Sequence, residues 1–138
     1  MNVLFLDQFS DLGGAQLCLM DLVPAVQAVG WIVSCAVPGR GRLVEKLHER
    51  GVTVHSLPVT HLASGHKSAR ESLRFAREAP KLVREIHRLA EETGPDVLYV
   101  NGPRLLPLRR AATLALCRSG LLAFHLQRRG SAAWYACH

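Results

Sequence analysis

The first 30 residues constrain the fold most, because they join a short apolar run, a glycine turn and a long apolar segment. The run at residues 3–6 is bounded by Asp7, which is typical of a strand buried on both faces of a parallel sheet. A polar turn follows and ends at Gly13 and Gly14, before a mostly apolar segment that reaches Gly30. The stretch therefore predicts a strand, a glycine loop and a helix, in that order.

Apolar runs and helical patterns continue to alternate along the rest of the chain. Further strands are predicted at residues 31–37, 52–57, 97–100 and 121–126. Helices are predicted at residues 42–50, 68–93 and 103–117, with Pro80 expected to kink or split the second of these. This alternation indicates an α/β domain, a Rossmann-like doubly wound parallel sheet of about five strands in the order 3-2-1-4-5 with helices on both faces.

The length of 138 residues suits one domain with a real core. Residues 1–127 carry all the predicted strands and helices, so we assign them to this domain. Residues 128–138 show no hydrophobic period. We therefore expect them to form an irregular or truncated tail.

The charge distribution is uneven, since all 17 Lys and Arg lie after residue 37 and the formal net charge is +6. Such asymmetry is compatible with an anionic partner. However, the arginines of residues 70–88 alternate with glutamates at helical spacing, which favours a solvated helix face. We expect no nucleic-acid partner, and peripheral contact with a membrane surface stays open as an alternative.

The four cysteines have no paired spacing, and no apolar run approaches the roughly 20 residues of a membrane span. A disulfide framework is therefore not expected, and a reduced compartment fits better. These features predict a cytoplasmic protein, with a position at the inner face of the membrane as the alternative.

Ligands of open α/β sheets bind beyond the carboxyl ends of the strands. Gly13 and Gly14 follow the first predicted strand, Asn101 follows the fourth and His125 lies near the end of the fifth. A glycine pair lets the backbone approach a phosphate at a helix N-terminus. The glycines and His125 also have a purely structural interpretation, the glycines as a tight turn and His125 as a core histidine. No metal site is expected, because His61 and His66 lack partners at ligand spacing and the Cys137-His138 end is expected to fray.

Four segments together are similar to a known family. The stretches VLFLDQFSDLGGAQLCLMDLVPAVQAVGW, VPGRGRLVEKLHERGVTVHSLPV, PDVLYVNGPR and LLAFHLQ resemble the N-terminal domain of the retaining, group 1 (family 4-like) glycosyltransferases with the GT-B fold. The resemblance covers about residues 2–127. Their order and spacing are more specific than any one of them alone.

The resemblance implies a transfer of a sugar from a nucleotide-sugar donor to an acceptor, with retention and without a metal ion or other cofactor. In that family the glycine loop lies against the donor diphosphate, which implies donor-binding roles for Gly13 and Gly14. The histidine that ends the fifth strand faces the reaction centre, which implies a catalytic role for His125. The residue after the fourth strand lines the acceptor side, which implies substrate binding by Asn101. Electrostatic support of the leaving diphosphate is the implied catalytic device.

The chain departs from the family by stopping before any second domain. In the family the C-terminal domain binds most of the nucleotide and carries a carboxylate pair in an E-x7-E arrangement. We therefore expect this chain to be the acceptor-side half of a glycosyltransferase and to be inactive alone. Two alternatives stay open: a non-catalytic Rossmann-like binding module, and a half-molecule that pairs with a partner chain or with itself through an apolar cleft face. No residue selects the sugar, the nucleotide or the acceptor.

Overall fold

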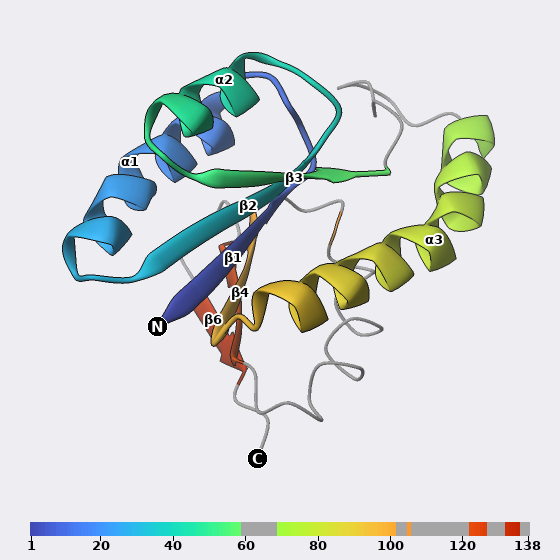
Figure 1. Cartoon of the computed structure of the whole chain (residues 1–138). Helices are drawn as coiled ribbons and strands as arrows, with labels where there is room; N and C mark the ends of the chain where they lie inside the picture. Colours follow the sequence, from blue (N-terminus) through green and yellow to red (C-terminus); the bar gives the residue numbers. More distant parts are fainter. Residues whose placement is uncertain (59–68, 102–104, 106–121, 127–131, 136–138) are drawn as a thin grey trace.

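The computed structural model describes residues 1–58, 69–101, 105, 122–126 and 132–135. These residues form one mixed sheet flanked by helices (Figure 1). The elements are β1 (Asn2–Asp7), α1 (Gly14–Ala28), β2 (Ile32–Pro38), α2 (Arg42–Glu49), β3 (Thr53–Leu57), α3 (Ala69–Thr93), β4 (Val97–Asn101), β5 (Leu122–Leu126) and β6 (Ala132–Tyr135).

The strand order is β3-β2-β1-β4-β5-β6. The first five strands pair in parallel, and β1 lies between β2 and β4, with Val3 opposite both Val33 and Val97. The predicted order 3-2-1-4-5 is therefore confirmed. From β1 the chain adds β2 and β3 on one side and then β4 and β5 on the other. The carboxyl ends of β1 and β4 therefore flank the switch point where doubly wound folds bind ligands.

Alternate residues of β1 pack into two separate cores, because successive side chains of a strand point to opposite faces. Val3 and Phe5 pack with buried residues of α1 and α2. Leu4 and Leu6 pack with Leu82, Ile86 and Leu89 of α3. Figure 1 shows the same division, with α1 and α2 on one side of the sheet and α3 on the other. The predicted placement of helices on both faces is confirmed.

The expectation of an irregular tail after residue 127 is wrong for Ala132–Tyr135. These residues form β6, which pairs antiparallel with β5 and sets Tyr135 opposite Ala123. The four residues are too few to show a period, so the sequence pattern did not reveal the strand. Pairing is nevertheless favourable because it satisfies backbone groups along an edge of β5 that would otherwise stay open.

Helix α3 runs through Pro80 without a break, so the alternative of two separate helices is excluded. Its axis changes direction along its length (Figure 1), as expected where proline removes a helical donor. Arg74 pairs with Glu78, and Arg88 pairs with both Glu85 and Glu92 on the exposed side. These pairs fit the solvated face that the charge pattern favoured.

Several predicted features lie outside the described residues. They are the loop that contains His61 and His66, the helix expected at residues 103–117 and the Cys137-His138 end. Within the described residues, no helix combines the length and the apolar composition needed to cross a membrane.

The two described cysteines differ in their expected reactivity, because the thiolate is the reactive form. Cys18 is exposed on α1, whereas Cys35 is buried in β2. Burial, assisted by the nearby Asp7 carboxylate, raises the pKa of Cys35 to about 12. Iodoacetamide should therefore modify Cys18 in the native protein and Cys35 only after unfolding, as measured by peptide mass spectrometry with and without guanidinium. Equal rates for the two thiols in the native protein would contradict this assignment.

Candidate functional site

The N-terminus of α1 is open. Gly13 is its N-cap in an extended conformation, Gly14 begins the helix, and both are exposed. Gly13 supplies no side-chain cap, and the first turn of α1 contains no acidic residue. The first N–H groups of a helix have no partner within the helix and carry a partial positive charge. This end of α1 can therefore accept an anion through its backbone.

A buried polar network lies directly beneath the first turn of α1. Its centre is Asp7, the last residue of β1, which is 1% exposed. The Gln16 Nε2 donates to Asp7 Oδ1 at 2.7 Å, and the Asn101 Nδ2 donates to Asp7 Oδ2 at 2.6 Å. The backbone N–H of Phe9 also donates to Oδ1, at 2.9 Å. One carboxylate thus ties together the ends of β1 and β4 and the start of α1.

Burial and hydrogen bonding have opposite effects on the pKa of Asp7. Burial raises its pKa to about 6, and the hydrogen bonds from Phe9, Gln16 and Asn101 offset only part of that effect. A buried carboxylate stays ionised only where donors replace its lost hydration. Asp7 therefore gains or loses its proton close to the physiological range.

The side chain of Asn101 is 5% exposed, and its amide nitrogen makes two hydrogen bonds within the protein. Besides its bond to Asp7, its Nδ2 donates to the carbonyl oxygen of Ala15 at 3.2 Å. Asn101 thus holds the first turn of α1 against the end of β4. The structure brings this residue next to the glycine turn, as the sequence analysis expected, but its role in substrate binding stays a prediction.

His125 lies in β5, where the parallel register sets it opposite Val100. This position is one residue before the level of Asn101 in the neighbouring strand. Gly13, Gly14, Asn101 and His125 therefore come from the carboxyl ends of three adjacent strands. Their roles in donor binding and catalysis stay predictions.

The loop after β2 packs tightly against the loop after β1. The backbone N–H of Leu43 donates to the carbonyl oxygen of Ser10 at 2.9 Å. A Cβ atom at Gly41 would lie 2.4 Å from that oxygen and 2.7 Å from the Ser10 carbonyl carbon. Ser10 is fully buried, and its Oγ has no hydrogen-bond partner among the described residues. Only glycine at position 41 permits this approach.

Asp7, Gln16, Ser10 and Gly41 also build the site, although none of them was predicted as a site residue. A signal existed for Asp7, because a carboxylate that directly follows an apolar strand falls at the ligand-binding edge of the sheet. Gln16 gave a weaker signal as a polar residue within an apolar helix. In the described parts of the chain, no three His, Cys, Asp or Glu side chains lie close enough together to hold a metal ion.

Fold and site together define a doubly wound α/β domain whose switch point presents an uncapped helix N-terminus. No protein-family model matches the sequence, and no curated protein matches it either. Solved structures do match the fold. HepE (Alr3699) from Anabaena, in complex with UDP and glucose, has a TM-score of 0.62 and 22% identity, over 91% of this chain and 29% of HepE.

Two further structures share this fold. The glycotransferase of kitacinnamycin has a TM-score of 0.62 and 15% identity, over 90% of this chain and 29% of its own. The C-terminal domain of PF1911 hydrogenase from Pyrococcus furiosus has a TM-score of 0.63 and 16% identity, over 91% of this chain and 90% of that domain. The chain thus has the Rossmann-like α/β fold found in these proteins, and it spans less than a third of the length of HepE or the glycotransferase.

Proposed function

We propose that this chain forms the N-terminal, acceptor-side domain of a GT-B glycosyltransferase that transfers a sugar from a nucleotide-sugar donor with retention. The observation that carries the proposal is the uncapped N-terminus of α1 at the switch point, with Gly13 and Gly14 exposed. A diphosphate is the kind of ligand such a terminus binds, through backbone N–H groups and the helix dipole. The fold it shares with a UDP-bound protein and a glycotransferase supports the same function.

The residue roles follow from this proposal. Gly13 and Gly14 contact the donor diphosphate, His125 faces the reaction centre and Asn101 borders the acceptor side. In our proposal Asn101 acts through its neighbours, since its amide nitrogen is bound to Asp7 and Ala15. The chain alone does not turn over donor, because the larger part of the nucleotide site belongs to a second domain. The proposed location is the cytoplasm, where the free thiols of Cys18 and Cys35 would persist.

The first test is the mass of the native gene product, detected with an antibody raised to this chain. A product of more than twice 15.2 kDa that transfers sugar from a nucleotide donor would support the proposal. Turnover of a nucleotide sugar by the purified 138-residue chain would overturn the statement that it is inactive alone. A product near the mass of this chain, without transfer activity, would favour the alternatives below.

Replacement of Gly14 by valine should harm activity far more than folding. Gly14 is exposed at the first position of α1, and valine has a slightly better helix propensity than glycine, so the melting temperature should change little. The branched side chain would keep a diphosphate from the backbone N–H groups. We expect kcat/KM of the intact enzyme to fall by about 10- to 100-fold.

The matched control is Ala28→Val, an exposed position at the other end of the same helix. This variant should retain full activity. A Gly14→Val variant that loses activity and thermal stability in equal proportion would reduce the glycine loop to a structural turn.

A second candidate function is a single-domain binding module. Its support is the likeness to the PF1911 hydrogenase domain, in which the match covers about nine tenths of both chains. Saturable binding of UDP without transfer, by a native product of this size, would favour this alternative.

The related alternative is a half-molecule that pairs with a partner chain or with itself. Its support is the exposure of Leu12 and Leu17 on either side of the glycine turn. A mass that rises with protein concentration in analytical ultracentrifugation would favour pairing, and a monomer at all concentrations would count against it.

A further inference from the structure

A pocket of about 430 Å³ lies between α2 and β3, which is an edge strand of the sheet. None of its lining residues belongs to the Asp7 network or to the first turn of α1. It is lined by Gly39, Arg40, Val44, His48, Val54, His55 and Ser56. We propose that this pocket binds the phosphate group of a small phosphate monoester that also carries an apolar part.

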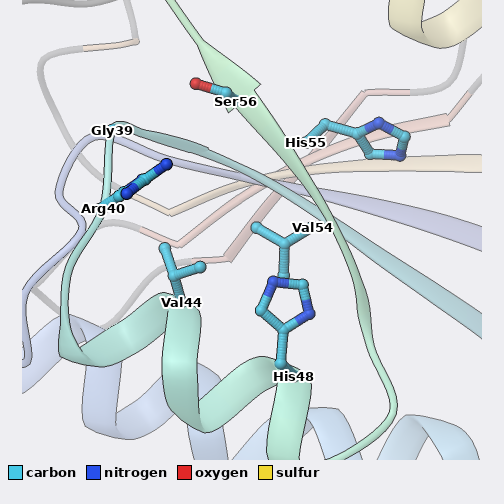
Figure 2. A pocket seen from close by; sticks show the side chains of 7 residues that line it. All are labelled: Gly39, Arg40, Val44, His48, Val54, His55 and Ser56. Carbon is cyan, nitrogen blue, oxygen red and sulfur yellow. The ribbon is translucent and has the colours of Figure 1, made fainter.

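The side chains divide into a polar rim and an apolar wall. Figure 2 shows Arg40 beside Val44, Ser56 on the strand above, and His48 next to Val54. The ring of His55 projects from the other side of β3, as strand alternation requires, so its backbone lines the pocket. Three donor-bearing side chains, Arg40, His48 and Ser56, thus surround an apolar wall of two valines.

The lining of the pocket favours a negatively charged ligand. No acidic residue lines it, and among the described residues no carboxylate forms an ion pair with Arg40 or His48. Helix α2 carries two acidic residues, Glu45 and Glu49. Neither lines the pocket, and Glu49 pairs with Lys46. An arginine without a partner offers a planar fork of donors that matches phosphate oxygens.

The backbone of the loop brings Arg40 to the edge of the pocket. Gly39 has a φ of +63°, a left-handed conformation that favours glycine, and a Cβ there would have nothing within 4 Å. The turn at Gly39 lets the chain leave β2 and bring Arg40 over the start of α2 (Figure 2). The turn that joins the strand to the helix therefore determines where the Arg40 side chain starts.

The volume and the apolar lining of the pocket together favour a ligand larger than a phosphate ion. A volume of about 430 Å³ lies within the range of small-molecule sites and exceeds the space that one phosphate group needs. Val44 and Val54 can cover an apolar group attached to that phosphate, whereas a fully polar ligand would leave them unused. A phosphate monoester with an apolar substituent uses both parts.

The test is isothermal titration of the full chain with phenyl phosphate, inorganic phosphate and phenol. We expect saturable binding of phenyl phosphate with one site, weaker binding of inorganic phosphate and no binding of phenol. Arg40→Gln should weaken the binding of phenyl phosphate by about tenfold or more. Arg42→Gln is the matched control, because Arg42 is exposed two positions further on and does not line the pocket.

His48→Gln provides a second variant should Arg40→Gln fold poorly, which circular dichroism would detect. It should also weaken binding, and the amide resonances of Val44 and Ser56 should shift when phenyl phosphate is added to the native chain. An equal loss in Arg40→Gln and Arg42→Gln would mean diffuse attraction by a basic surface and would overturn the proposal. So would the absence of saturable binding, or inorganic phosphate binding as tightly as phenyl phosphate.

Discussion

As the pH rises from about 3 to about 7, the ionisation of Asp7 should lower the free energy of unfolding by about 3 kcal/mol. Burial raises the pKa of this carboxyl from 3.8 to about 6 in the folded chain. The folded state therefore binds the proton more tightly than the unfolded state does. The tighter proton binding stabilises the folded state fully at pH values below the pKa of the unfolded chain, 3.8. This stabilisation is lost as the pH rises through the pKa of the folded chain, about 6.

The measurement is urea unfolding at several pH values in this window for the native chain and for Asp7→Asn. The variant cannot titrate at this position, so the difference between the two stability curves isolates Asp7 from the other groups. The amide that this substitution introduces would also face the donors of Gln16 and Asn101, so the absolute stability of the variant is not the readout. The slope of stability against pH is the readout.

The matched control for this experiment is Asp21→Asn, an exposed position on the same helix that Asp7 helps to anchor. Its stability should follow the pH in parallel with the native chain. Parallel curves for the native chain and Asp7→Asn would contradict the raised pKa of Asp7. Because Asp7 lies beneath the first turn of α1, its ionisation also changes the charge next to the open helix N-terminus.

Replacement of Gly41 by alanine should destabilise the chain by about 2–3 kcal/mol. The backbone at Gly41 is extended, so its conformation alone admits any residue. The constraint is the approach of Ser10, whose carbonyl oxygen would lie 2.4 Å from the new Cβ. Since both partners are backbone, the two loops must separate, and the hydrogen bond from Leu43 to Ser10 must lengthen.

The control is Gly30→Ala, which tests backbone strain without a steric clash. Gly30 has a φ of +80°, and nothing lies within 4 Å of the position that a Cβ would take, so the cost should be about 1 kcal/mol. Hydrogen exchange at the Leu43 amide should accelerate in Gly41→Ala and stay unchanged in Gly30→Ala. A Gly41→Ala variant as stable as the native chain would mean that the loops separate at no cost.

The order of the strands followed from local patterns. Residues 3–6 and 97–100 are apolar runs that end at a polar residue, and the segments between strands carry helical periodicity. A parallel sheet with helical crossovers admits few arrangements, so these patterns were enough to predict the neighbours of β1. The position of Gly13 and Gly14 at the start of α1 could be predicted for the same reason, because turn chemistry is local.

The sequence by itself therefore determined the layers, the parallel strand order and the glycine turn at the switch point. Only the tertiary structure decided which polar groups meet there: Asn101 reaches Asp7 across 94 positions, and Gly41 meets Ser10 from a different loop. It also decided the pairing of β6, whose four residues carry no period. The physical reason is that periodicity and turns are encoded by neighbours in the chain. Hydrogen bonds and close approaches between distant segments depend instead on strand register and on how the loops pack.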